Sequence, residues 1–109
     1  MTGNEYQALA ARTIATENYV DMRKHALYGM ASEVGELLGL YQKRYQGHLI
    51  DTEHAMKETG DILWMIAEYC TSMGWELEDV MQENIDKLRL RYPDGFDEMR
   101  SKNRPQDDI

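Results

Sequence analysis

Apolar residues recur at helical spacing over most of the chain, and no segment alternates polar and apolar residues as a strand does. Glycine and proline divide this helical pattern into four segments. They run roughly over residues 4–17, 23–46, 52–73 and 76–91. We therefore predict an all-α protein with a four-helix, bundle-like fold.

Residues that favour helix ends stand at these boundaries. They are Asn4 and either Asp51 or Thr52 at helix starts, and Gly47, Gly74 and Pro93 at or after helix ends. Residues 1–96 then form one helical domain, the size of a single small core. Residues 97–109 are polar and contain a proline, so we expect them to form a mobile tail.

The composition excludes several classes of function. A net charge of -8 repels a phosphate backbone, which argues against nucleic-acid binding. No apolar run approaches the roughly 20 residues of a membrane span. The N-terminus lacks a signal-peptide pattern and Cys70 is the only cysteine, so we expect a cytoplasmic protein. Nucleotides remain candidate ligands, because a divalent cation can bridge acidic side chains to phosphates.

Two pairs of acidic residues interrupt the apolar stripes of the second and third segments. Glu33 and Glu36 lie within "SEVGELLGL", and Glu58 and Asp61 lie within "KETGDILWMIAEYC". On a helix, Glu33 and Glu58 fall within about 80° of their apolar neighbours, and Glu36 and Asp61 take the stripe edges. The other acidic pairs with this spacing lie on the polar side of the fourth segment or beyond its end. We therefore expect four carboxylates to converge between two packed helices.

The fourth segment carries polar residues toward the same core. Asn84 lies inside its apolar stripe, and Lys87 and Arg91 lie along one edge. Four acids pressed together would repel one another and take up protons, and a hard divalent cation removes that penalty. Mg²⁺ keeps open positions that phosphate oxygens can fill, while the amide and the two cations meet phosphate charge. The combination suits metal-assisted attack on a phosphate ester or anhydride.

Structural roles compete with these assignments. Glu33 and Glu58 could form buried ion pairs, although few cations stand near them in the sequence. Lys87 and Arg91 could be ordinary cations at a helix C-terminus, and Asn84 could satisfy a purely structural partner. Tyr6 on the first helix could line a base pocket or simply pack.

The chain resembles the MazG-like all-α nucleoside triphosphate pyrophosphohydrolases, which carry an E-x-x-E pair followed by an E-x-x-D pair on the next helix. Here the pairs read "EVGE" and "ETGD", and "ENIDKLRLRYPDGF" follows in the expected order. The match covers roughly residues 4–96. One detail departs from the family pattern, since Trp75-Glu76 stands where many relatives cap the fourth helix with Ser or Thr. Some members carry a second acid before the first pair, where this chain has Ser32.

The resemblance implies a homodimer or homotetramer that cleaves (deoxy)nucleoside triphosphates between the α and β phosphates. The products would be a nucleoside monophosphate and pyrophosphate. Glu33, Glu36, Glu58 and Asp61 would hold Mg²⁺, with Mn²⁺ as a substitute, and Glu36 or Glu33 would orient or deprotonate the attacking water. Asn84, Lys87 and Arg91 would bind the substrate phosphates.

Three other functions compete with this one. The nearest is the same chemistry on phosphoribosyl-ATP. A redox di-metal carboxylate bundle would need E-x-x-H motifs, and no glutamate here has a histidine three residues later. A non-enzymatic helical interaction module would not need all four acids, and all four are present.

Overall fold

The computed structural model describes residues 1–109 and contains five helices and no strand. The helices are α1 (Gly3–Ala11), α2 (Tyr19–Tyr45), α3 (Thr52–Met73), α4 (Leu77–Arg91) and α5 (Glu98–Lys102). The predicted all-α class is therefore confirmed. The chain divides into two compact units, Met1–Glu76 and Leu77–Ile109, which are described separately below. None of the helices combines the length and apolar character that a membrane span requires.

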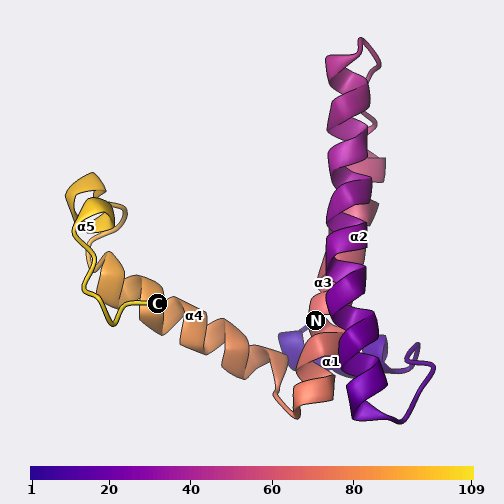
Figure 1. The fold of residues 1–109 in the computed structure, drawn as a ribbon, viewed down its shortest axis with the longest axis horizontal. Coiled ribbons are helices and arrows are strands. Elements are labelled where there is room, and N and C mark those ends of the chain that lie inside the picture. The colour runs from indigo at the N-terminus through magenta and orange to yellow at the C-terminus, as the bar shows by residue number, and fades with distance from the viewer. The chain divides into compact units, whose positions relative to one another are not determined.

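In the first unit, α2 and α3 are long neighbouring helices, and α1 packs on α3 near one end of the pair (Figure 1). The contact between α2 and α3 follows one stripe on each helix. On α2 the stripe is Met22, Ala26, Gly29 and Glu33, and on α3 it is Glu58, Asp61, Met65, Glu68 and Ser72. These residues are spaced three or four apart, the spacing that places side chains on one helix face.

Helix ends follow the capping residues. The Asp51 carboxylate accepts from the backbone N–H groups of Glu53 and His54, which confirms the predicted start of α3. Gly74 ends α3 in the left-handed region at φ 71°, as expected for a C-terminal glycine. The backbone N–H of Trp75 then donates to the Cys70 carbonyl at 2.9 Å, which closes the turn.

Three predicted boundaries were wrong. The first helix was expected over residues 4–17, but it begins at Gly3 with Thr2 as its N-cap and ends at Ala11. The second begins at Tyr19 rather than Arg23, because the Asn18 side chain accepts from the N–H groups of residues 20 and 21. The threonine and asparagine side chains between the two helices can accept hydrogen bonds from backbone N–H groups in place of helix carbonyls. They therefore favour a helix cap over a continuous helix.

The second unit contains α4 and the short helix α5. Residues 97–109, which we expected to form a mobile tail, include α5, and Asp97 caps this helix by accepting from the N–H of Met99. Arg91 at the end of α4 also pairs with Asp108 near the end of the chain. Hydrophobic periodicity could predict neither feature, because one is a single cap and the other is an ion pair between residues far apart in the sequence.

Candidate metal centre

Three of the four predicted metal ligands come together between α2 and α3. Glu33 extends the α2 stripe by one turn beyond Gly29, and Glu58 and Asp61 precede Met65 on the α3 stripe. One carboxylate oxygen from each of Glu33, Glu58 and Asp61 lies within 4.8 Å of the others. All three residues are half-buried. Their oxygens are the hard, anionic donors that Mg²⁺, Mn²⁺ and Ca²⁺ prefer.

Close packing of the two helices explains how the acids meet. Gly29 faces Met65, and a Cβ atom added at Gly29 would lie 2.9 Å from Met65 Cγ and nearer still to Met65 Sδ. The absence of a side chain at Gly29 thus allows α2 to approach α3 at this level. Glu33 lies four residues further along α2, so this approach also carries Glu33 toward the two acids of α3.

The electrostatic environment of Glu33 differs from that of an isolated glutamate. Burial is the largest cause that raises the pKa of Glu33 above its ordinary value, and the charges of Asp61, Glu58 and Glu36 add to it. A bound cation would reverse this effect, because it favours the ionised carboxylate. The cluster is therefore arranged to bind positive charge.

Glu36 lies outside the group of three. It is exposed to solvent, and its carboxylate is not among the oxygens that lie within 4.8 Å of one another. Its charge nevertheless contributes to the raised pKa of Glu33, so it lies beside the cluster.

Two neighbours of the cluster carried little or no signal in the sequence. The Nε2 atom of His54 lies 3.0 Å from Glu58 Oε1, a contact that their spacing of four residues makes possible on one helix. Burial and then the charge of Asp61 raise the pKa of the Tyr6 phenol on α1. His54 thus contacts the cluster directly, and the charge of the cluster influences Tyr6.

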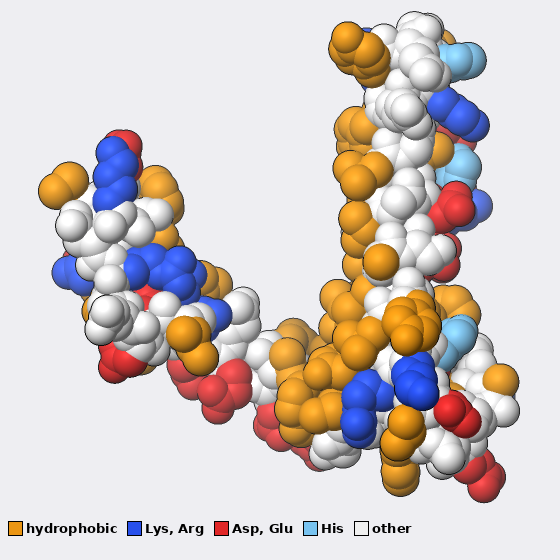
Figure 2. All heavy atoms as spheres, viewed as in Figure 1, with side chains coloured by type: hydrophobic (Ala, Val, Ile, Leu, Met, Phe, Trp, Pro, Cys, Tyr) orange, Lys and Arg blue, Asp and Glu red, His pale blue; other side chains and the backbone are white.

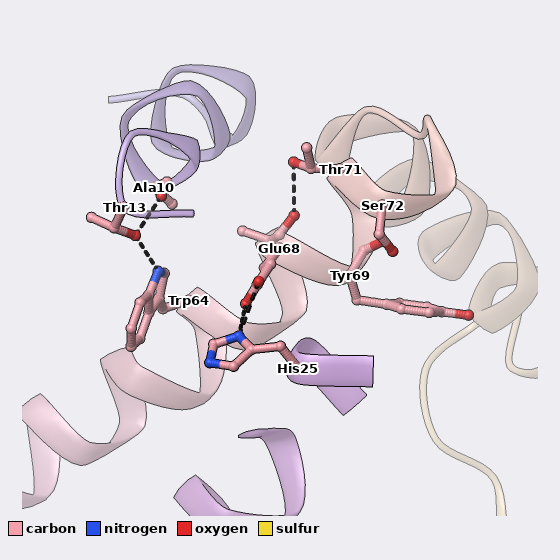
Figure 3. A network of polar contacts seen from close by, with 9 residues as sticks. Ala10, Thr13, His25, Trp64, Glu68, Tyr69, Thr71 and Ser72 are labelled. Atoms are coloured by element: carbon pink, nitrogen blue, oxygen red, sulfur yellow. Dashed lines mark hydrogen bonds and ion pairs between the residues drawn. The ribbon is translucent and has the colours of Figure 1, made fainter. Parts of the chain in front are cut away.

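A second acidic site on the α3 stripe was missed in the sequence. Glu68 is only 4% exposed, and its Oε2 atom lies 2.8 Å from Nδ1 of His25 on α2 (Figure 3). The signal was the spacing of seven residues from Asp61, which places Glu68 on the same face of α3. Figure 3 also shows Trp64 Nε1 donating to Thr13 Oγ1, at 2.8 Å, which ties α3 to the segment after α1.

The predicted phosphate ligands belong to the second unit. Asn84 and Lys87 are exposed on α4, while Arg91 is half-buried and forms a bidentate pair with Asp108. The acids belong to the first unit. The convergence of Asn84, Lys87 and Arg91 with the four acids therefore stays a prediction.

Comparison with known proteins identifies the family. A family model described as MazG nucleotide pyrophosphohydrolase domain matches residues 21–96, which include both acidic pairs and all of α4. Comparisons with curated proteins and with solved structures give no match. The matched region spans most of the chain and contains the helix pair that carries the acidic cluster. The chain belongs to the MazG nucleotide pyrophosphohydrolase family.

Proposed function

We propose that the protein is a Mg²⁺-dependent nucleotide pyrophosphohydrolase that cleaves (deoxy)nucleoside triphosphates between the α and β phosphates. The observation that carries the proposal is the cluster of Glu33, Glu58 and Asp61, in which three oxygens from two helices lie within 4.8 Å of one another. Such a cluster is costly without a cation and suits one that also binds phosphate oxygens.

The four acids together form the proposed metal site. Glu33, Glu58 and Asp61 hold Mg²⁺, or Mn²⁺ in its place, and Glu36 completes the set from its exposed position. When bound, the cation neutralises charge that develops on the phosphate oxygens. His54 supports this arrangement by contacting Glu58 on the side of its Oε1 atom.

Glu36 is our candidate for the residue that activates water. It stands beside the cluster, but its carboxylate is free of the tight three-oxygen group. The water oxygen attacks the α phosphorus, and its proton passes to the Glu36 carboxylate. The bond from the α phosphorus to the bridging oxygen breaks, and pyrophosphate leaves with that oxygen. Glu33 is the alternative base, because it is the other glutamate of the same pair and lies in the cluster itself.

Asn84, Lys87 and Arg91 are proposed to contact the phosphates. Their amide and cationic groups suit phosphate oxygens, and an arginine can bind two of them at once. The family match extends through residue 96 and so includes all three residues.

Product analysis tests the reaction. The purified protein is incubated with Mg²⁺ and a panel of canonical and modified nucleoside triphosphates, and the products are resolved by mass spectrometry. Monophosphate and pyrophosphate are expected. Diphosphate and orthophosphate would contradict the proposed position of cleavage. No turnover would contradict the triphosphate substrate, and phosphoribosyl-ATP would then be the next substrate to assay.

Matched variants test the site. Glu58→Gln removes one charge from the cluster, and Glu53→Gln removes one from an exposed position on the same helix. We expect the first to lower kcat/KM by about 100-fold or more, the scale of losing a transition-state contact, and the second to leave it unchanged. Equal activity in both variants would refute the metal assignment. Lack of Mg²⁺ binding in calorimetry would favour a non-enzymatic module instead.

We further propose that the protein acts as a homodimer or homotetramer in the cytoplasm. Several apolar side chains of α2 are exposed, among them Tyr28 at 72%, Leu38 at 61% and Tyr41 at 55%. Figure 2 shows hydrophobic side chains along one edge of the α2–α3 pair, and such a surface is commonly covered by a second copy. The single cysteine, buried and unpaired, supports a reducing compartment. Light scattering on the purified protein measures its oligomeric state.

A further inference from the structure

The second unit contains a cationic pocket, of whose residues the sequence had indicated only Lys87 and Arg91. It encloses about 450 Å³ between the end of α4 and the segment after α5. Its charged lining residues are Lys87, Arg91, Arg100, Arg104, Asp107 and Asp108. Four cationic side chains against two acidic ones give the side chains of this pocket a net positive charge, although the whole chain carries a net charge of -8. A positive pocket on an acidic protein attracts anions.

Within the pocket, Asp108 already forms ion pairs with two of the cations, Arg91 and Arg104. Arg91 Nε donates to Asp108 Oδ2 at 2.9 Å, and Arg91 Nη2 donates to Asp108 Oδ1 at 2.8 Å. The side chains of Arg91 and Asp108 are only 13% and 17% exposed. Arg104 holds the same residue, with Nε 3.4 Å from Oδ2 and Nη2 3.0 Å from the backbone carbonyl of Asp108.

This geometry is the one in which arginine binds phosphate. A guanidinium places two parallel N–H groups at the spacing of two oxygens, and carboxylate and phosphate compete for that fork. The hydrogen bond from Arg91 is the largest cause that lowers the pKa of Asp108, so the carboxylate is ionised at neutral pH. Lys87 and Arg100 line the same pocket and form no ion pair, which leaves positive charge for a ligand with several anionic oxygens.

We propose that this pocket binds phosphate groups and that Asp108 is an internal competitor that covers Arg91 until phosphate displaces it. The ligand class is a polyphosphate, either the triphosphate chain of a nucleotide or the released pyrophosphate. The effect on hydrolysis rests on the proposed function. Phosphate binding to the pocket does not.

Calorimetry with inorganic tripolyphosphate, without Mg²⁺, tests binding directly. Asp108→Asn removes the competing charge with little change in shape. Asp94→Asn removes the same charge from an exposed position of the second unit outside the pocket. We expect Asp108→Asn to bind tripolyphosphate about three- to tenfold more tightly than the unchanged protein. The variant lacks the mostly buried carboxylate that competes with phosphate for the two N–H groups of Arg91. Asp94→Asn should bind as the unchanged protein does.

The outcomes separate the two proposals. Equal affinity in both variants, or no binding in either, overturns the pocket and its competitor. If Asp108→Asn binds more tightly but no nucleoside triphosphate is hydrolysed, the proposed function fails and the anion pocket stands. If hydrolysis occurs, Asp108→Asn should lower KM by the same factor and leave kcat nearly unchanged. Asp108→Ala repeats the test with a second side chain, and circular dichroism checks that its helix content is retained.

Discussion

Replacing Gly29 by alanine tests whether the close approach of α2 and α3 depends on the missing side chain. The new Cβ atom would lie 2.9 Å from Met65 Cγ, closer than ordinary van der Waals contact. Met65 is only 2% exposed, so its side chain has little space into which it can move. The helices must therefore separate locally, or Met65 must adopt a strained rotamer.

The magnitude follows from a matched substitution in the same helix. A Cβ atom at Gly39 would meet nothing within 4 Å. Both alanines gain the same helix propensity, about 1 kcal/mol over glycine. Only Gly29→Ala adds overpacking, which costs about 1–3 kcal/mol. Gly29→Ala should therefore be less stable than Gly39→Ala by about 1–3 kcal/mol, or about 4–12 °C in Tm for a chain of this size.

Thermal and urea denaturation, followed by circular dichroism without metal, measure this difference. Repeating the melts at several protein concentrations separates helix packing from any change in self-association. A Gly29→Ala protein that is as stable as Gly39→Ala would refute the packing argument. We also expect Gly29→Ala to reduce the rise in Tm that Mg²⁺ produces, because Glu33 lies one turn further along α2.

Further predictions concern other acids of α2 and α3. The pKa of Glu33 is raised in the folded protein, so between the ordinary value of 4.5 and the raised value the folded protein holds a proton that the unfolded chain has released. Metal-free stability should therefore fall as the pH rises through this range. Glu33→Gln should weaken this pH dependence and raise Tm at neutral pH, as melts across the pH range will show. His25→Ala should cost about 1–3 kcal/mol in urea denaturation, because it leaves the buried Glu68 without its partner, and adding Glu68→Leu should recover part of the loss. Asp51→Ala should cost about 1 kcal/mol by removing the N-cap of α3, and an unchanged urea midpoint would contradict that role.

Some features could be predicted from the sequence because they are local. The all-α class and the ends of α3 follow from spacing and capping residues, which act within a few positions of the chain. The start of α2 could also have been predicted from local sequence, because Asn18 is a residue type that favours the N-cap. The family also follows from the order of the acidic pairs, and the matched residues 21–96 confirm it.

Other features depend on contacts between distant segments. Periodicity placed Glu33 and Glu58 on apolar stripes, but it could not show that these stripes face each other or that Glu36 stays outside the tight group. The pairing of Glu68 with His25 and of Asp108 with Arg91 likewise joins residues far apart in the sequence.

The sequence by itself determined which helix face each acid occupies, because 3.6 residues per turn fix that face wherever the helix packs. Only the tertiary structure decided which acids meet. That depends on how closely α2 approaches α3, and a missing side chain at Gly29 opposite Met65 sets the approach. Packing of this kind depends on the shapes of two surfaces together, and neither segment contains that information alone.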